Sequence, residues 1–95
     1  MSLTVLSVAY PLAPVGPDAA GGAEQILHRL DEALTKAGHR SIVVAQAGSR
    51  IAGELVPLPR EVDGLERAQE RAASAVRHAI GRVLRRMPVD LVHLH

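Results

Sequence analysis

A glycine pair and an acid that follows it are the first residues whose types and spacing could support chemistry. Gly21 and Gly22 end a stretch rich in proline and glycine, and Glu24 comes two residues later. Adjacent glycines let the backbone approach a ligand, and the N–H groups at a helix start favour an anion such as phosphate. The pair could equally be a tight turn between two elements. Glu24 could orient a ligand hydroxyl, or be a first-turn acid favoured by the helix dipole. The sequence leaves both choices open.

Two histidines near the end of the chain are the second candidate group. His93 and His95 share one face of an expected strand, which is the spacing of a metal-binding pair. No third ligand lies near them in the sequence, so we predict no metal site. We interpret His93 as a packed strand residue and His95 as a side chain that points into a crevice at the end of the strand.

The spacing of the glycines argues against two familiar nucleotide-binding loops. The dinucleotide fingerprint G-x-G-x-x-G is absent, because the glycines of the loop are Gly16, Gly21 and Gly22. No acid that could hold a ribose ends the second expected strand, which runs into Ala45–Gly48. A P-loop is excluded because position 22 is glycine where that motif requires lysine. We therefore expect neither NAD nor any other cofactor.

These candidates must be positioned by the apolar segments around them. Short apolar runs bounded by proline, glycine or polar residues predict strands. They lie at Leu3–Ala9, Ser41–Ala45 and Leu91–His95, with a shorter one at Leu55–Val56. The stretch Tyr10–Gly22 holds three prolines and three glycines, so it is expected to be a loop.

Two longer segments have the periodicity of amphipathic helices. The first has one apolar stripe, and we expect it to end at Gly38. The stripe is formed by Ala23, Ile26, Leu27, Leu30, Leu34 and Ala37. Asp63 and Glu66 resemble a capping box that opens the second, and Pro88 ends it. Its apolar half comprises Leu65, Ala68, Ala72, Val76, Ala79, Ile80, Val83, Leu84 and Met87.

The order strand, loop, helix, strand, strand, helix, strand predicts an α/β fold with a Rossmann-like parallel sheet. We expect the first strand in the centre, the second and third to one side and the fourth on the other, with the helices on opposite faces. Ligands bind at the switch point of such sheets. The Gly16–Gly22 loop and His95 would wall that crevice.

Composition narrows the classes of partner. The 95 residues suit one small domain, 47% are apolar, and Tyr10 is the only aromatic residue, so no stacking platform for nucleic acid is encoded. The net charge is +1, there is no cysteine, and neither a signal peptide nor a membrane-spanning segment is expected. These features predict a cytoplasmic protein. Arg77, Arg82, Arg85 and Arg86 could touch an anionic membrane weakly, or form a solvated helix face.

Several segments, taken in order, resemble the start of retaining GT-B glycosyltransferases of the group 1 or family 4 type. They are Val8–Pro11, Gly21–Glu24, Ala33–His39, Ile42–Ala45 and Pro88–His95. The resemblance implies two Rossmann-like domains that face each other across a cleft. The N-terminal domain binds the acceptor, and its glycine-rich loop, here Gly21 and Gly22, approaches the diphosphate of a nucleotide sugar held mainly by the C-terminal domain.

By this resemblance, residues 1–95 would be part of the N-terminal acceptor-side domain, without the donor-binding domain. The family's catalytic residues lie beyond residue 95, so none is assigned, and the chain alone is expected to be inactive and to self-associate. In the parent enzyme, a nucleotide sugar and a sugar or lipid acceptor would be the partners. A non-catalytic Rossmann-like module for a phosphate ligand or a protein partner, and a fragment of a sugar-nucleotide epimerase, remain alternatives.

Overall fold

The computed structural model describes residues 2–9, 15–16, 22–59 and 65–94, without the side chains of residues 23 and 65–69. Within these ranges the elements follow in the order β1 (Thr4–Val8), α1 (Gly22–Lys36), β2 (Arg40–Gln46), β3 (Glu54–Leu58), α2 (Leu65–Arg86) and β4 (Leu91–Leu94). Each expected strand and helix is present. The third strand is longer than predicted, because it continues through Pro57 to Leu58.

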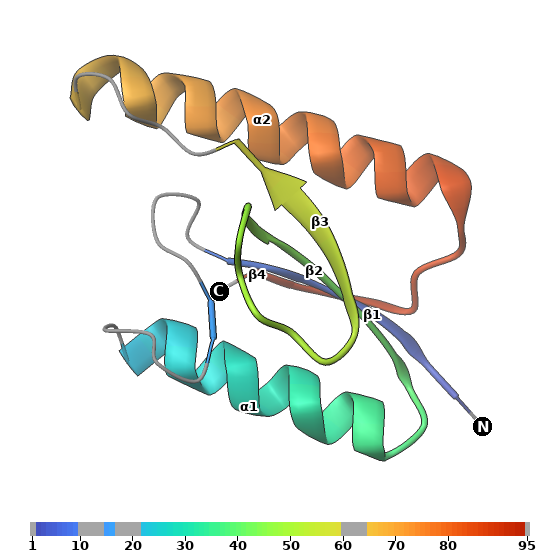
Figure 1. Ribbon diagram of the computed structural model, residues 1–95. Coiled ribbons are helices and arrows are strands. Elements are labelled where there is room, and N and C mark those ends of the chain that lie inside the picture. Colours follow the sequence, from blue (N-terminus) through green and yellow to red (C-terminus); the bar gives the residue numbers. More distant parts are fainter. Residues whose placement is uncertain (1, 10–14, 17–21, 60–64, 95) are drawn as a thin grey trace.

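The four strands form one parallel sheet in the order β3-β2-β1-β4. β1 therefore lies between β2 and β4, and its Leu6 is level with Ile42 on one side and Val92 on the other. The helices cover opposite faces of the sheet (Figure 1). This arrangement confirms the predicted α/β fold and its predicted strand order.

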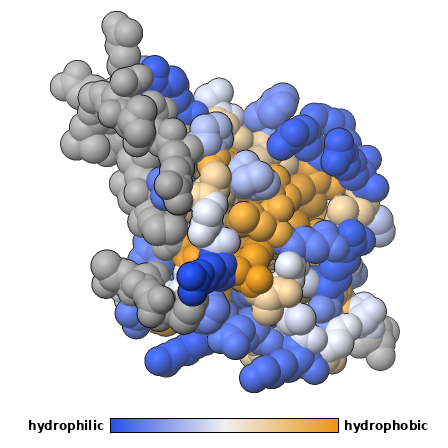
Figure 2. Space-filling model, viewed as in Figure 1, coloured by the Kyte–Doolittle hydropathy of each residue, from blue (hydrophilic) through white to orange (hydrophobic). Residues whose placement is uncertain are grey.

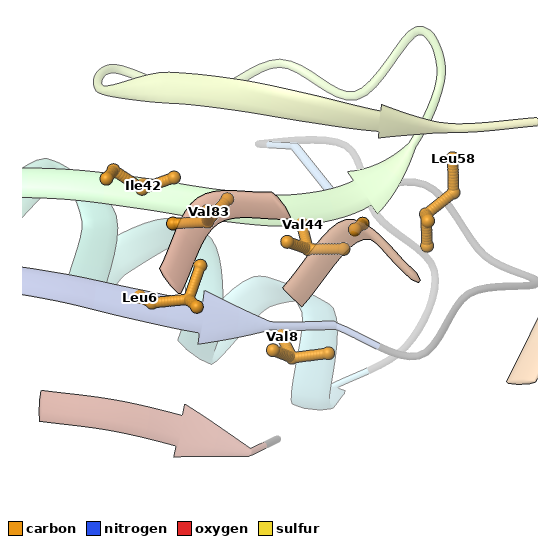
Figure 3. Packing of buried hydrophobic residues seen from close by; sticks show 7 residues of the cluster. Leu6, Val8, Ile42, Val44, Leu58 and Val83 are labelled. Atoms are coloured by element: carbon orange, nitrogen blue, oxygen red, sulfur yellow. The ribbon is translucent and has the colours of Figure 1, made fainter. Parts of the chain in front are cut away.

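Alternating side chains of the central strands build a separate core under each helix. On the α2 face, Leu6 and Val8 of β1 and Ile42 and Val44 of β2 pack with Val83 of α2 (Figure 3). On the α1 face, Val43 and Ala45 pack with Leu27, which is completely buried. Both faces of β2 are thus covered, which explains why its sequence is continuously apolar rather than alternating.

The end of α1 is set by Gly38. Its φ of 85° lies in the left-handed region, where a Cβ is costly. The N–H of Gly38 donates to the Thr35 carbonyl, and the N–H of His39 donates to the Leu34 carbonyl. These two bonds form a Schellman motif, which satisfies carbonyls that the helix end would leave unpaired. The predicted stop at Gly38 is correct.

The apolar stripes of both helices are narrower than the sequence pattern suggested. Ile26 is 60% exposed and Leu84 is 49% exposed, although both were placed on apolar faces. A helix buries a stripe roughly 100° wide. Leu27 and Val83 occupy the centres of the two stripes, which leaves Ile26 and Leu84 on their flanks. The predicted cap residue Asp63 lies outside the described residues.

The two edges of the sheet differ in chemistry. The Leu58 carbonyl of β3 accepts a hydrogen bond from the Ala47 N–H, so the backbone groups of Leu58 face the β2 side. Successive residues of a strand face opposite sides, so Leu55 and Pro57 direct their backbone groups away from β2, toward the free edge of the sheet. Pro57 has no N–H to offer there, which protects this edge against further strands. β4 has neither proline nor a formally charged residue, and its Leu94 is 72% exposed. The sheet is therefore open to extension at β4 rather than at β3.

Candidate functional site

The loop between β1 and α1 is anchored to the loop that follows β2. The N–H of Val15 donates to Ser49 Oγ at 2.9 Å, and the Val15 carbonyl accepts from the Arg50 N–H at 2.8 Å. Ser49 Oγ in turn donates to the Gln46 carbonyl at 2.7 Å. Val15 is buried, so this part of the loop is held at the carboxyl ends of β1 and β2. These strand ends form the edge at which open α/β sheets bind ligands.

Gly22 is the first residue of α1 and is exposed to solvent. A Cβ built on it meets no described atom within 4 Å, and Gly22 is not among the glycines with a positive φ. Neither packing nor backbone strain in the described structure therefore requires glycine at this position. This observation weakens the interpretation of Gly22 as a turn residue alone. Gly21, its predicted partner, lies outside the described residues.

Glu24 lies in the first turn of α1, where the helix dipole favours an acid. It is only 9% exposed, so it is not a fully solvated surface residue. The structure places Gly22 and Glu24 within the same helical turn. This location suits both predicted roles of Glu24, and its contact with a ligand stays a prediction.

The loop also has a cationic neighbour that the sequence analysis missed. Gly16 is buried, and a Cβ built on it would lie 3.5 Å from the Cβ of Arg50. Arg50 is exposed, so its guanidinium can reach solvent beside the loop. A cation there would reinforce the preference of the α1 N-terminus for an anion. The spacing of Gly16 and Arg50 in the sequence does not predict this contact, because the contact depends on how two loops pack against each other.

The switch point of the sheet lies between β1 and β4, where the strand order reverses. On β4, His93 is half-buried, level with Ser7 of β1. His95, the residue expected to point into the crevice, lies outside the described residues. Within the described ranges no three side chains among His, Asp and Glu gather in a group that could hold a metal ion.

Asp31 of α1, the most buried charged side chain among the described residues, was not among the predicted site residues. It is 1% exposed. Asp31 Oδ1 accepts from Ser41 Oγ at 2.7 Å and from the Gly53 N–H at 3.2 Å, while Oδ2 accepts from the Ala52 N–H at 2.6 Å. Asp31 thus ties α1 to β2 and to the loop before β3. Its carboxylate is used entirely within the fold, so we assign it a structural role.

Asp90, part of the Asp-Leu-Val-His segment, also has a structural use. Its Oδ2 accepts from the Thr4 N–H at 2.7 Å, and its own N–H donates to the Thr4 carbonyl at 2.9 Å. Asp90 therefore aligns β4 with the start of β1.

No helix within the described ranges is both long and apolar enough to span a bilayer.

Comparison with known families adds a finding consistent with this geometry. The family model described as Glycosyltransferase Family 4 matches residues 20–95 of the chain. The match begins next to the glycine pair and runs through β4. No curated protein and no solved structure matches the chain significantly.

Proposed function

Because the chain belongs to Glycosyltransferase Family 4, we propose that it forms the opening, acceptor-side part of the N-terminal domain of a nucleotide-sugar-dependent glycosyltransferase. The transferred sugar would pass from the nucleotide to an acceptor hydroxyl. In this proposal the β1–α1 loop and the first turn of α1 form the wall of the cleft next to the donor diphosphate. The family match over residues 20–95 is the observation that carries the proposal.

The local geometry around α1 supports an anion at this wall. Gly22 is exposed at the helix N-terminus, with no described neighbour close to where a side chain would begin. The N–H groups of the first turn have no partners within the helix, and they carry the positive end of its dipole. The Cβ and backbone of Arg50 lie beside Gly16 of the loop, and its exposed side chain carries a positive charge. A phosphate could approach this backbone closely, which is the use that glycine allows.

The proposal also concerns the longer enzyme of which these residues would be a part. The donor would be held mainly by a second domain, so residues 1–95 alone would not catalyse transfer, because catalysis requires donor and acceptor to be held together. The absence of cysteine is compatible with a cytoplasmic location. The open edge at β4 would be covered by later strands in the parent enzyme. In the 95-residue chain alone it would promote self-association. Weak contact of the α2 arginines with an anionic membrane is an alternative, which binding to phosphatidylglycerol vesicles tests.

A pair of variants at Gly22 in the full-length parent tests the role of the loop. Gly22→Val should abolish sugar transfer, because a branched side chain would occupy the space that a phosphate needs. Its melting temperature should stay close to the wild-type value, since no described atom lies within 4 Å of a Cβ at this position. Gly22→Ala, which adds one carbon, should lose less activity. Normal transfer by a stably folded Gly22→Val enzyme would return the glycine to a connecting role.

The coding sequence after residue 95 separates the proposal from its alternatives. A second βα domain carrying paired glutamates supports a transferase. A stop codon directly after His95 supports a non-catalytic module that binds a phosphate ligand or a protein. A sugar-nucleotide epimerase has the same architecture, so it is distinguished by assay. An epimerase would convert the nucleotide sugar into its epimer without an acceptor, whereas a transferase would require one.

A further inference from the structure

A groove lies between the C-terminal half of α2 and the outer strand β3. It has a volume of about 260 Å³, and apolar side chains of three elements line it, among them Ile42, Val56, Val83 and Met87. Figure 2 shows an apolar surface between α2 and β3 that is framed by hydrophilic residues. The groove lies on the face of the sheet that α2 covers, whereas Gly22 begins α1 on the opposite face (Figure 1).

Two arginines line this groove without a matching acid. Arg82 and Arg86 are one helical turn apart on α2, and both are exposed. Glu54 is the acid that also lines the groove, but both of its carboxylate oxygens accept hydrogen bonds from Arg40, at 3.1 and 3.2 Å. Within the described residues no ion pair engages Arg82 or Arg86. The groove thus combines an apolar floor with two guanidinium groups that are free to bind an anion.

Addition of further strands to the sheet would leave the groove accessible. Pro57 removes an N–H from the outward edge of β3, so a further strand cannot pair regularly there and cover the groove. β4 lies at the opposite edge of the sheet and offers the better site for extension. Strands added at β4 would leave α2 and β3 as they are. Extension of the sheet is therefore expected at the edge away from the groove.

Size and shape indicate what could occupy it. Pockets for small molecules have volumes of roughly 300–1,000 Å³, so this groove lies below their usual range. It suits one or two apolar side chains of a partner, like the central pockets of protein interfaces. Its apolar floor is recessed between α2 and β3, where a flat membrane surface would contact only the arginines. Carboxylates at positions i and i+4 of a helix have the same spacing as Arg82 and Arg86.

We propose that this groove is a docking site for an acidic amphipathic helix of a partner protein. An apolar side chain of that helix would rest against Val83 and Met87, and two carboxylates one turn apart would pair with Arg82 and Arg86. Guanidinium–carboxylate pairs of this kind are charge-assisted and geometrically specific. The site is separate from the proposed donor-side wall, because α2 and α1 cover opposite faces of the sheet.

Fluorescence anisotropy with a designed peptide tests this proposal on the 95-residue chain. The probe is a labelled helical peptide of about 15 residues, long enough to form a helix, with leucines and i,i+4 glutamates on one face. Wild-type protein should bind it saturably. The Arg82→Glu/Arg86→Glu variant should bind at least about tenfold more weakly, since tenfold corresponds to one lost interaction of about 1.4 kcal/mol. Circular dichroism verifies that the variant is folded.

The matched control is Arg77→Glu/Arg85→Glu, which changes the same net charge on α2 but at arginines that do not line the groove. It should retain peptide binding. Equal losses in both double variants would mean nonspecific attraction by the helix and would overturn the proposal. So would binding that survives when the peptide's leucines are replaced by serine. Phosphatidylglycerol vesicles serve as a second probe. Binding to vesicles but not to the peptide would identify the face as a membrane contact instead.

Discussion

Replacing Asp31 with asparagine should destabilise this domain far more than any substitution of an exposed acid. The carboxylate accepts three hydrogen bonds, from Ser41 Oγ and from the N–H groups of Ala52 and Gly53. An asparagine of the same shape can keep its oxygen toward Ser41 and Gly53. Its NH₂ group then faces the Ala52 N–H, two donors at a site where the native atoms are 2.6 Å apart.

The magnitude follows from this lost acceptor. A buried donor left without a partner costs about 1–3 kcal/mol; the Ala52 N–H is only partly buried, but here the two donors must also move apart. We expect Asp31→Asn to lower the free energy of unfolding by about 2–3 kcal/mol. A domain of this size is stabilised by only about 5–14 kcal/mol in total. One kcal/mol shifts the melting temperature of such a domain by about 4–8 °C. The expected decrease is therefore roughly 8–24 °C.

Thermal and urea unfolding followed by circular dichroism measure this effect. Glu32→Gln is the matched control, because it is the same change at the adjacent, solvent-accessible position, where Glu32 pairs with His28 at 2.9 Å. A helical i,i+4 pair contributes only about 0.3–0.5 kcal/mol. Ser41→Ala should cost less in the Asp31→Ala background than in the wild type, because the two groups are coupled. Equal midpoints for Asp31→Asn and Glu32→Gln would refute the assigned structural role.

Two further substitutions test other features of the fold. Gly53→Ala should reduce the free energy of unfolding by about 1–3 kcal/mol, because its Cβ would collide with the Ser41 carbonyl oxygen. Urea denaturation measures this, and a wild-type midpoint would contradict it. Leu94→Lys should shift the 95-residue chain toward monomer, because it places a charge on the open edge strand. Light scattering at micromolar concentration decides this, and a wild-type chain that is already monomeric would contradict the predicted self-association.

The fold could be predicted because its determinants are local and repetitive. Continuous apolar runs such as Ser41–Ala45 indicate strands buried on both faces, and their alternation with amphipathic helices implies a parallel sheet. The exposure of Ile26 could not be predicted in this way. A hydrophobic pattern shows which residues are apolar, but not how far the covering helix extends over its sheet. α1 packs mainly against β2, and Ile26 lies on a side of the helix that no part of the sheet covers.

The candidate site was predicted less completely, for two physical reasons. Gly22 and Glu24 are recognisable from their position before a helix, and the structure places both in its first turn. Gly21 and His95 remain predictions. Arg50 was missed because its contact with Gly16 results from packing between two loops. Asp31 did carry a signal, since an acid four residues after Leu27 interrupts the apolar stripe. Two of its three donors are backbone N–H groups, however, and no side-chain pattern identifies them.

The hydrogen bonds of Asp31 and Asp90 have a consequence for the order in which the chain folds. Asp31 joins groups that are 10 to 22 residues apart, whereas Asp90 meets Thr4 across 86 residues. Closing a longer loop costs more conformational entropy, and contacts distant in sequence form more slowly. We therefore expect α1, β2 and β3 to assemble as an early unit, and β4 to dock onto β1 last. During synthesis, β4 would leave the ribosome after β1, β2 and β3, the strands that precede it in the chain.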